Sequence, residues 1–527
     1  MPLDLQTRLK SQWALVLAVA VGAFATWFAL RYARQPILEQ DAFRQTLTAL
    51  TSYWMIEEGW SFSYQTPVVG YPWKLPFEFP LYQSVVALVA WAGQWPLEPV
   101  GRLVSFGFLL GCAWPAAAIA TRLKVPRETT WIFCALVWSS PLYLFWGRTF
   151  LIETTAVFFT LAAMAFALDL REPFPRWQSA FAFALFASLA MLQKNVTAAP
   201  ALMVMALVAI GTHVRRDARF SWRQIPVLAV FLVPVAIGLA WTWYTDSIKA
   251  GHFFGRLWTS REALALYVGS FSDRLDLKAA RDLILERIVA QNAGGIIGMM
   301  VVAAGLLVAE RRTRGIIAIC IVLFFVPITL FFPQHVKWDY YPASCVVFLL
   351  GAIALSLVAL GRKGGSAHVL VLIATTLIVG LNSWHFRIGY WNDATRNISA
   401  ESSNRTLLVA DAIRRHTPQD SAIVVFGLSW SSEVAFYSQR KALTVEEPLE
   451  AYIEQQNFRN LLGGKQLGAI AFLSSRNRER YNRIVQKYSD ESTSGLFDGG
   501  GWYIWLPNVA SLRLADGRQL FPVDQIN

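Results

Sequence analysis

Cysteine is scarce in this sequence, and the few cysteines present exclude two kinds of site. Four occur, at Cys112, Cys134, Cys320 and Cys345, and all of them lie in apolar runs. None belongs to a Cys-x-x-Cys pair, so neither a zinc site nor a disulfide framework is indicated. The sequence also lacks a G-x-G-x-x-G or Walker motif and any evident internal repeat.

Charged residues are also scarce, at 16% of the chain against 55% hydrophobic residues, and the mean hydropathy is +0.40. Repeated apolar runs of spanning length place the 527-residue chain among the polytopic membrane proteins. A formal net charge of +12 would suggest nucleic acid as the partner of a soluble protein. Here the basic residues cluster in short links between apolar runs, as in cytoplasmic loops. We therefore expect the lipid bilayer as a partner, and no nucleic acid.

Twelve apolar runs and the basic links between them predict the topology. The runs lie near residues 12–31, 81–95, 102–121, 131–146, 150–168, 178–192, 197–212, 225–244, 294–310, 315–332, 342–361 and 367–384. The basic links at 213–223, 310–314 and 361–363 are expected in the cytoplasm. The membrane sides assigned to all the links are mutually consistent only if residues 81–95 form an interfacial or re-entrant helix instead of a span. We therefore expect 11 spans, an uncleaved first span and a cytoplasmic N-terminus.

Two regions are too polar to cross a membrane. The first is an exterior loop at residues 34–80, which carries carboxylates, aromatic residues and prolines directly after the first span. The second begins near residue 385 and alternates β-rich runs with helix-like segments. Its β-rich runs lie at 422–429, 469–474 and 502–507. We expect a transmembrane domain at 1–384 and a small α/β domain at 385–527 on the exterior, periplasmic side.

Unusual polar residues concentrate on one side of the predicted membrane. The cytoplasmic links are short and basic, whereas the exterior links carry carboxylates, cations and tyrosines close to the apolar runs. These residues are Glu39, Asp41, Arg44, Lys74, Glu78, Arg148, Glu153, Lys194, His335, Lys337, Asp339, Tyr340 and Tyr341. Charged groups at that depth are costly unless they are paired or line a polar cavity. They indicate one site for an anionic, membrane-embedded substrate.

Five motifs on that side resemble the lipid-linked-sugar glycosyltransferases of the GT-C superfamily, in the branch of the protein O-mannosyltransferases and the lipid A aminoarabinose transferase. They read EQDAFRQ at 39–45, PFEFPLYQ at 76–83, WGRTFLIETTAVFF at 146–159, QKNVTAAP at 193–200 and HVKWDYYP at 335–342. PFEFPLYQ is similar to the form in bacterial members that modify polysaccharides or lipopolysaccharide. The resemblance implies a polytopic α-helical GT-C fold of about 11–13 transmembrane helices in the bacterial inner membrane. It also implies that the donor is a sugar on a polyprenyl phosphate.

Asp41 matches the catalytic aspartate that the family carries early in its first exterior loop. The acceptor hydroxyl must lose a proton as it attacks the anomeric carbon, and a carboxylate can accept it. Asp is also a favoured N-cap, so the alternative is that Asp41 only caps a helix starting at Ala42. A single base with in-line attack implies inversion, whereas a second carboxylate about 5 Å away would leave retention open.

Three cations are candidates for binding the donor phosphate: Arg148, Lys194 and Lys337. Arg148 would stabilise charge on the leaving group. The alternative is that Arg148 and Glu153 form an intramembrane ion pair that holds two helices together. Lys194 stands where the family often has a lysine, and the alternative is that it snorkels to the interface. The resemblance implies that the segment containing Lys337 lines the donor site.

His335, Tyr340 and Tyr341 resemble the His-and-paired-Tyr motif that the family has before a span. The spacing of His335 from the tyrosines departs from the family's pattern. Tyrosines at a membrane interface are usually part of an aromatic belt, which is the alternative to a binding role.

The remaining candidates, Glu39, Arg44, Lys74 and Glu78, lie in the first exterior loop. The resemblance implies that the segment around Glu78 lines the donor and acceptor cavity, and neighbouring prolines stiffen it. Glu39, Asp41 and Glu78 are also suited to hold a divalent cation through oxygen ligands. The motifs are more similar to the metal-independent branch, so we expect no required cofactor.

We therefore expect a glycosyltransferase that acts at the periplasmic face. Nucleotide sugars are absent there, so the sugar must come from a lipid carrier. The sugar stays open, and so does the acceptor, which is a polysaccharide or lipopolysaccharide, another lipid or a protein. One alternative is a transporter or flippase of lipid-linked glycans, which would need polar residues at mid-membrane and access from both faces. A second is a non-catalytic partner in an envelope assembly complex.

Overall fold

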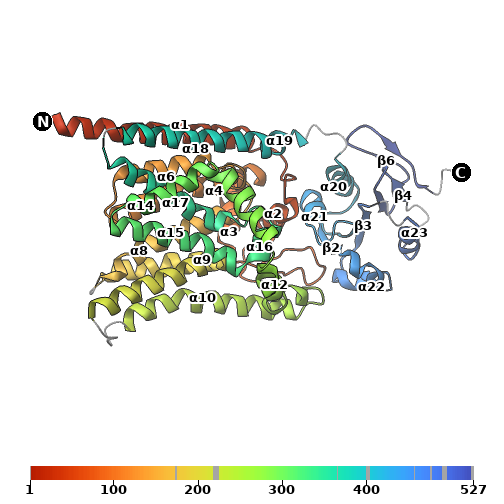
Figure 1. The fold of residues 1–527 in the computed structure, drawn as a ribbon. Coiled ribbons are helices and arrows are strands. Elements are labelled where there is room, and N and C mark those ends of the chain that lie inside the picture. The colour runs from red at the N-terminus through yellow and green to blue at the C-terminus, as the bar shows by residue number, and fades with distance from the viewer. Residues whose placement is uncertain are drawn as a thin grey trace. The chain divides into compact units, whose positions relative to one another are not determined.

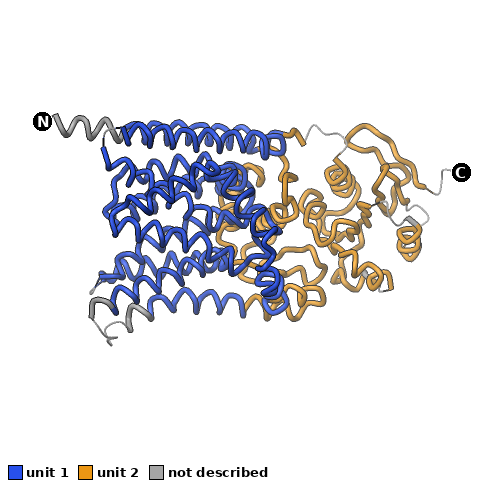
Figure 2. The backbone as a smooth tube through the Cα atoms, in the orientation of Figure 1, with its two compact units in different colours: residues 1–33, 101–243, 260–395 blue, residues 34–100, 244–259, 396–527 orange. Residues whose placement is uncertain are grey.

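The computed structural model describes residues 2–172, 175–217, 225–364, 366–398, 404–455, 457–474, 478–488 and 495–523. The chain divides into two compact units, shown in different colours in Figure 2. Unit 1 consists of residues 1–33, 101–243 and 260–395, and unit 2 of residues 34–100, 244–259 and 396–527.

Unit 1 is built of helices (Figure 1). The helices with all or most of their residues in it are α1 (Pro2–Arg31), α4 (Leu97–Gly111), α5 (Ala113–Arg122), α6 (Arg127–Ser139), α7 (Pro141–Trp146), α8 (Glu153–Ala167), η1 (Asp169–Arg171), α9 (Trp177–Asp217), α10 (Ile225–Ala250), α11 (Ser260–Val268), α12 (Phe271–Arg274), α13 (Leu277–Arg281), η4 (Asp282–Ala290), α14 (Ile296–Val308), α15 (Arg311–Leu330), α16 (Phe332–Lys337), α17 (Ala343–Gly361), α18 (Ala367–Gly389) and α19 (Trp391–Thr395). Within the described chain, eight helical segments are long and apolar enough to cross a membrane.

α9 counts as one of these segments but consists of two helices that meet at Lys194. The backbone of Lys194 is extended, with φ −161° and ψ 96°. Near the start of α9, Ser179 Oγ donates to Asp169 at 2.8 Å, and near its end His213 Nε2 lies 2.9 Å from the carbonyl of Leu170. Both ends of α9 therefore reach the same turn, so the chain reverses at Lys194. The two separate apolar runs predicted at 178–192 and 197–212 are confirmed.

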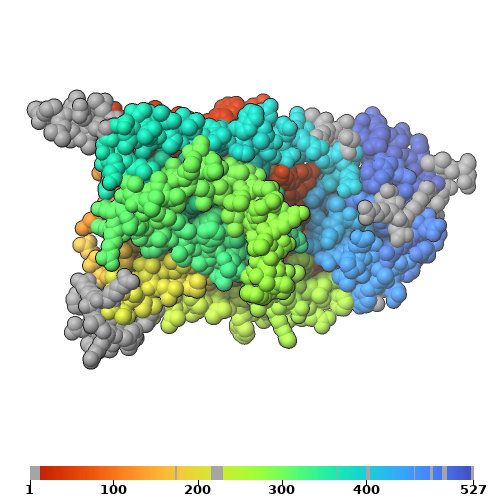
Figure 3. Space-filling view, in the orientation of Figure 1, coloured from red at the N-terminus to blue at the C-terminus, as the bar shows by residue number. Residues whose placement is uncertain are grey.

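The core of unit 1 is formed by helices that are apolar on all sides. Nearly every side chain of α17 is buried, as expected for a helix without a polar face that packs against α6, α14, α15 and α18. Helices further out expose large apolar residues, such as Leu307 on α14 and Leu370 on α18. Figure 3 shows the side chains of these helices as a continuous outer surface of unit 1. Such a surface suits contact with lipid.

Unit 2 contains the polar parts of the chain and two sheets. Its elements are α2 (Ala42–Glu58), α3 (Leu81–Gly93), η3 (Gly255–Trp258), α20 (Arg405–His416), β1 (Ala422–Phe426), α21 (Glu433–Ser438), β2 (Lys441–Val445), η6 (Glu447–Leu449), α22 (Glu450–Gln455), η7 (Phe458–Leu462), β3 (Leu467–Phe472), α23 (Arg478–Gln486), β4 (Gly495–Asp498), β5 (Tyr503–Leu506), β6 (Leu512–Arg513) and β7 (Gln519–Leu520). The larger sheet has the order β2-β1-β3-β5-β4, and β6 pairs with β7. β2, β1 and β3 are parallel, and β5 is antiparallel to both β3 and β4.

The first loop pairs with the free edge of β2. Ala442 N donates to the carbonyl of Pro67, Thr444 N to that of Val68, and Gly70 N to that of Ala442, at 3.0, 2.8 and 3.1 Å. Lys441, the residue before Ala442 in β2, pairs through its ammonium with Glu58 at 2.6 Å. The loop therefore covers an edge that would otherwise expose unpaired backbone groups.

The fold class predicted from the sequence is confirmed: a polytopic helical protein with a small sheet-containing C-terminal part. The predicted strands at 422–429, 469–474 and 502–507 correspond to β1, β3 and β5. α3 has 13 residues, about 20 Å of helix, which is too short to cross the hydrocarbon core. The basic link at 213–223 lies partly outside the described residues.

Candidate functional site

In unit 1, a buried ion pair forms where α9 reverses. The ammonium of Lys194 lies 2.5 Å from Glu153 Oε2 at the start of α8, and the two side chains are only 7% and 3% exposed. Lys194 therefore does not snorkel to an interface, and that alternative is wrong. The alternative pairing of Glu153 with Arg148 is wrong as well, because Glu153 pairs with Lys194 across two helices.

Two tyrosines enclose the same lysine. The ammonium lies 5.1 Å from the ring centre of Tyr340 and 4.1 Å from that of Tyr341, within the range of cation–π attraction. Tyr340 also packs against Trp146, with ring centres 5.6 Å apart. Both tyrosines are buried, so within unit 1 they form walls around Lys194 instead of an exposed aromatic belt.

His335 lies beside this group and is kept neutral. Its Nδ1 lies 2.9 Å from the carbonyl of Phe331 and its ring centre 5.8 Å from that of Tyr341. The pKa of His335 is lowered to about 4, mainly by burial and to a lesser extent by the charges of Lys194 and Arg287. The structure therefore brings Glu153, Lys194, Tyr341 and His335 together, as the sequence predicts.

Arg148 occupies the irregular segment between α7 and α8. It is 1% exposed, and its guanidinium lies 5.2 and 5.3 Å from the ring centres of Phe28 and Phe145. The segment is held by α4, where Ser105 Oγ donates to the carbonyl of Leu151 at 3.1 Å. Arg102 lies one helical turn before Ser105 and is also 1% exposed, although the sequence analysis did not single it out. The sequence feature that could have identified Arg102 is its position as an arginine within an otherwise apolar run.

A second residue that sequence reasoning missed is Arg287, which organises the segment before α17. It donates to the carbonyls of His335 and Val336 at 3.0 and 2.8 Å and pairs with Asp339 at 2.9 Å. It lies in η4, 48 residues before His335, and no pattern in the sequence links the two. Lys337 is exposed, with its ammonium 4.8 Å above the ring of Trp338, rather than in the buried group around Lys194.

In unit 2, Asp41 stands at the start of α2 in a left-handed conformation, with φ 51° and ψ 39°. Asp41 occupies the N-cap position, but its carboxylate makes no capping hydrogen bond, so capping does not account for the carboxyl group. Left-handed backbone is uncommon for residues other than glycine, although aspartate adopts it more readily than most, and strained backbone clusters at functional sites. Glu39, two residues earlier, is buried.

Arg44 and Glu78 form an ion pair within the same unit that links α2 to the end of the first loop. Tyr64 fixes the segment of Glu78, because its hydroxyl donates to the carbonyl of Glu78 and accepts from Phe77 N, at 2.8 and 2.7 Å. Burial, followed by the charge of Glu78, raises the pKa of Tyr64 well above its usual range.

Two further features of the first loop bear on the predicted site. Lys74 is exposed and forms a backbone bridge with Gln65. Among the described residues, no three histidines, cysteines or carboxylates gather as metal ligands, and Glu78 pairs with Arg44. Glu39, Asp41 and Glu78 therefore do not form the cation site considered from the sequence.

An aromatic cluster of unit 2 includes Phe43 and Phe77, the residues next to Arg44 and Glu78 in the sequence. Trp430 lies 5.6 Å from Phe43, 6.4 Å from Phe77 and 4.2 Å from Trp258, measured between ring centres. The ammonium of Lys249 lies 5.7 Å from the ring centre of Phe77. All four rings are half-buried, so they offer aromatic faces beside the first loop.

The residues that begin α2 are anchored on the C-terminal part of unit 2. Thr46 Oγ1 lies 2.8 Å from Ser432 Oγ, and Ser432 Oγ also donates to the carbonyl of Phe43 at 2.9 Å. Ile37 N donates to Tyr437 Oη at 2.7 Å. Asp41 lies between Ile37 and Phe43 in the chain, so the backbone on both sides of it is hydrogen-bonded to α21 or to Ser432, the residue before it.

Comparison with known proteins identifies similar sequences and folds. The sequence model described as dolichyl-phosphate-mannose-protein mannosyltransferase matches residues 99–253. The fold is similar to ArnT from Cupriavidus metallidurans bound to undecaprenyl phosphate, with a TM-score of 0.61 and 14% identity over 93% of this chain and 98% of that one.

Two further structures share the fold. One is the archaeal oligosaccharyltransferase AglB from Archaeoglobus fulgidus, in complex with an inhibitory peptide and a dolichol-phosphate, at TM-score 0.54 and 10% identity over 93% of this chain and 74% of that one. The other is the arabinofuranosyltransferase AftD from Mycobacteria, at TM-score 0.50 and 15% identity over 94% and 40%. No curated protein sequence matches the chain significantly.

Proposed function

We propose that the chain is a GT-C glycosyltransferase of the protein mannosyltransferase and ArnT branch, and that it transfers a sugar from a polyprenyl-phosphate donor to an acceptor of the bacterial envelope. The match of residues 99–253 to the mannosyltransferase model and the similarity of the fold to ArnT support this. The observation that carries the proposal is the burial of two cations, Arg148 and Lys194, at the ends of apolar helices of unit 1. Burying charge among apolar helices is costly, so such residues mark functional sites.

The buried cations suit a lipid-linked phosphate. A polyprenyl chain has the apolar surface to lie along the helices, and its phosphate needs cationic donors. In this proposal Arg148 and Lys194 bind the phosphate and stabilise the charge that develops on it as the sugar leaves. Glu153 holds Lys194 in place, and Tyr340, Tyr341 and His335 shape the surrounding cavity. Lys337, exposed in the structure, is a further phosphate ligand in the proposal.

We assign proton removal to Asp41. The acceptor oxygen forms a bond with the anomeric carbon while the bond from that carbon to the phosphate oxygen breaks. The hydroxyl proton passes to the carboxylate of Asp41, and polyprenyl phosphate leaves with the electron pair. The left-handed, non-capping Asp41 supports this role, because its carboxylate is not used by the helix that follows.

The other predicted residues of the first loop support the site in this proposal. The Arg44–Glu78 pair and Tyr64 fix the segment that follows α2, and Glu39, Lys74 and Glu78 contribute to the donor and acceptor cavity. The proposal requires no cofactor and places the reaction at the periplasmic face of the inner membrane. The N-terminus is cytoplasmic in this arrangement, and the acceptor is a polysaccharide or lipopolysaccharide, another lipid or a protein.

The proposal is tested with purified protein in lipid nanodiscs and undecaprenyl phosphates carrying mannose, glucose or aminoarabinose. We expect free undecaprenyl phosphate to appear with at least one donor when a crude envelope glycan fraction is added, and not without protein. A flippase would move the intact lipid across a vesicle membrane without releasing undecaprenyl phosphate. Lipid movement with no release from any donor would therefore favour the transporter and contradict the transferase.

A further inference from the structure

The larger sheet of unit 2 has a cavity at the carboxyl ends of its parallel strands. The chain runs from β1 to β2 on one side and then to β3 on the other side of β1. At such a reversal the connections leave in opposite directions, and open α/β sheets bind ligands in the crevice this creates. A cavity of about 640 Å³ lies there, lined by Gly427 and Ser429 after β1, Glu447 after β2, and Leu473 and Ser474 after β3.

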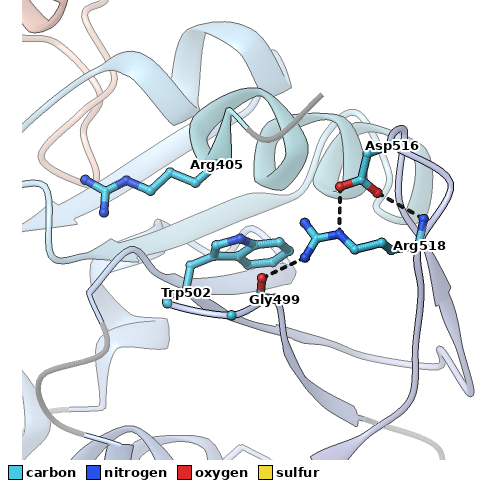
Figure 4. A pocket seen from close by; sticks show the side chains of 7 residues that line it. Arg405, Gly499, Trp502, Asp516 and Arg518 are labelled. Carbon is cyan, nitrogen blue, oxygen red and sulfur yellow. Dashed lines mark hydrogen bonds and ion pairs between the residues drawn. The ribbon is translucent and has the colours of Figure 1, made fainter. Parts of the chain in front are cut away.

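A second cavity of about 560 Å³ shares two lining residues with the first, Arg405 and Gly501. Its other walls come from Gly499, Gly500, Trp502, Asp516 and Arg518. Figure 4 shows Arg405 on one side of Trp502 and the Asp516–Arg518 pair on the other. Each volume lies within the roughly 300–1,000 Å³ that small-molecule sites occupy.

Arg405 is distinguished from the other arginines that line these cavities. Arg480 pairs with Glu450 and Glu454, and Arg518 pairs with Asp516. Arg405, exposed at the start of α20, donates to the carbonyl of Leu473 at 3.1 Å. Among the described residues no carboxylate lies within ion-pair distance of Arg405, although it interacts electrostatically with Glu433. Its guanidinium can therefore receive an anionic group where the two cavities meet.

The remaining lining suits a polyhydroxylated ring. The hydroxyl groups of Ser429 and Ser474 and the carboxylates of Glu447 and Glu450 line the cavity. Ser474 is also bonded to Tyr481 and Glu450 to Arg480, and hydroxyl and carboxylate oxygens can accept further hydrogen bonds from the hydroxyl groups of a sugar. Tyr481 provides an aromatic wall and is held in place by stacking on Phe472, with ring centres 4.1 Å apart. Sugars are commonly bound by such mixtures of charged groups and aromatic faces.

We propose that this cleft binds a saccharide unit carrying an acidic group, either a carboxylate or a phosphate, with that group on Arg405. The inference goes beyond sugar transfer and does not depend on it, because all the described residues that line the two cavities belong to unit 2. Binding needs neither the donor lipid nor Asp41.

The test is calorimetric titration of the full chain in detergent with tetragalacturonic acid, mannose 6-phosphate, maltotetraose and inorganic phosphate. We expect at least one of the two acidic saccharides to bind more tightly than maltotetraose and inorganic phosphate. Tighter binding of tetragalacturonic acid would identify the acidic group as a carboxylate, and tighter binding of mannose 6-phosphate would identify it as a phosphate. Arg405→Gln should weaken this binding about tenfold or more, because a charge-assisted hydrogen bond is lost, and Arg405→Lys should weaken it less.

Arg415→Gln is the matched control, since Arg415 is exposed at the other end of the same helix and lines neither cavity. It should leave binding unchanged. Equal affinity of wild type and Arg405→Gln, no binding of either acidic saccharide, or inorganic phosphate binding as tightly as the saccharides would each overturn the inference. Asp41→Asn should bind like wild type, so a failure of the proposed transfer reaction and a failure of this site are distinguishable.

Discussion

At the scale of single residues, the conformation of Asp41 and the pairing of Lys194 carry most of the functional argument. Asp41 has a left-handed backbone, which costs of the order of 1–2 kcal/mol for a residue other than glycine. The backbone on either side of it, at Ile37 and Phe43, is hydrogen-bonded to Tyr437 and Ser432. Lys194 is buried against Glu153 and two tyrosines at a break in α9. Both features are unfavourable locally, which is the pattern expected of functional positions.

The Lys194–Glu153 pair predicts a stability effect that is separate from function. Lys194→Met leaves Glu153 buried without its cation, which should cost about 3–5 kcal/mol. The double variant Lys194→Met/Glu153→Leu should recover most of this loss, because no charge is then stranded. Thermal unfolding in detergent measures both effects, and donor-lipid binding should remain lost in the double variant.

The matched control for this prediction is Arg281→Met. Arg281 pairs with Glu286 at 3.0 Å, but both side chains are mostly exposed, so the loss should be below about 1 kcal/mol. Equal destabilisation by Lys194→Met and Arg281→Met would contradict the account of the buried pair. So would a double variant that binds the donor lipid as wild type does.

His335 predicts a pH dependence of stability. Its pKa is lowered to about 4 in the folded protein, mainly by burial, from about 6.5 in the unfolded chain. Between these values the unfolded chain binds more protons, so stability should fall as the pH is lowered from 6.5 towards 4. His335→Gln should reduce the drop in melting temperature between pH 7 and pH 5, whereas His416→Gln, at an exposed histidine, should not. An identical pH response of wild type and His335→Gln would contradict this.

At the scale of elements, the pairing of the first loop with β2 is the feature that organises unit 2. Residues 67–70 complete the edge of the sheet through backbone hydrogen bonds, and α2 packs on α21. The loop that carries Asp41 is therefore ordered by strands that lie almost four hundred residues later in the chain. Order in the loop should depend on this edge.

Two glycines of the loop test this dependence. Gly59 and Gly70 both have positive φ, at 88° and 83°, so replacement by alanine strains the backbone at each. A Cβ at Gly70 would lie 2.8 Å from the carbonyl oxygen of Leu461, whereas nothing lies within 4 Å of one at Gly59. Gly70→Ala should therefore lower the melting temperature more and speed proteolysis within residues 34–80. Equal effects of the two variants would show that the contact with η7 is unimportant.

Periodicity and composition predicted the helices and strands that are buried because their own residues are apolar. The apolar helices, α3 and the Val- and Ile-rich strands β1 and β3 are examples. β2 was missed because it begins with Lys441, a buried lysine that is neutralised by Glu58 of the distant loop. Arg287 was missed for the same reason, since its partners follow about fifty residues later. Contacts between distant segments leave no periodic signal in either partner.

At the scale of the whole molecule, the domain boundary predicted from the sequence differs from the division into two compact units in the structure. The sequence suggests a division at residue 384, whereas residues 34–100 group with 396–527 in unit 2. The C-terminal segment is therefore more than an appendage, because it holds the segment that contains Asp41. Acceptor recruitment and organisation of the proposed base would then depend on the same unit.

Truncation tests this view. Removing the residues after Thr395 takes away β2 and α21, and transfer to every acceptor should be lost along with protection of the first loop. Removing only the residues after Asn508 keeps the five-stranded sheet and should preserve transfer. If the longer truncation retained transfer and changed only acceptor preference, the C-terminal segment would be a separable recruitment module.

The central claim is that Asp41 removes the acceptor proton during sugar transfer from a polyprenyl phosphate. Its most direct test is single-turnover release of undecaprenyl phosphate by the purified protein, with Asp41→Asn compared with Glu57→Gln, which changes an exposed carboxylate at the other end of α2. We predict a loss of about 10²–10⁴-fold for Asp41→Asn at unchanged donor affinity, and no loss for Glu57→Gln. Release by Asp41→Asn at the wild-type rate would contradict the claim.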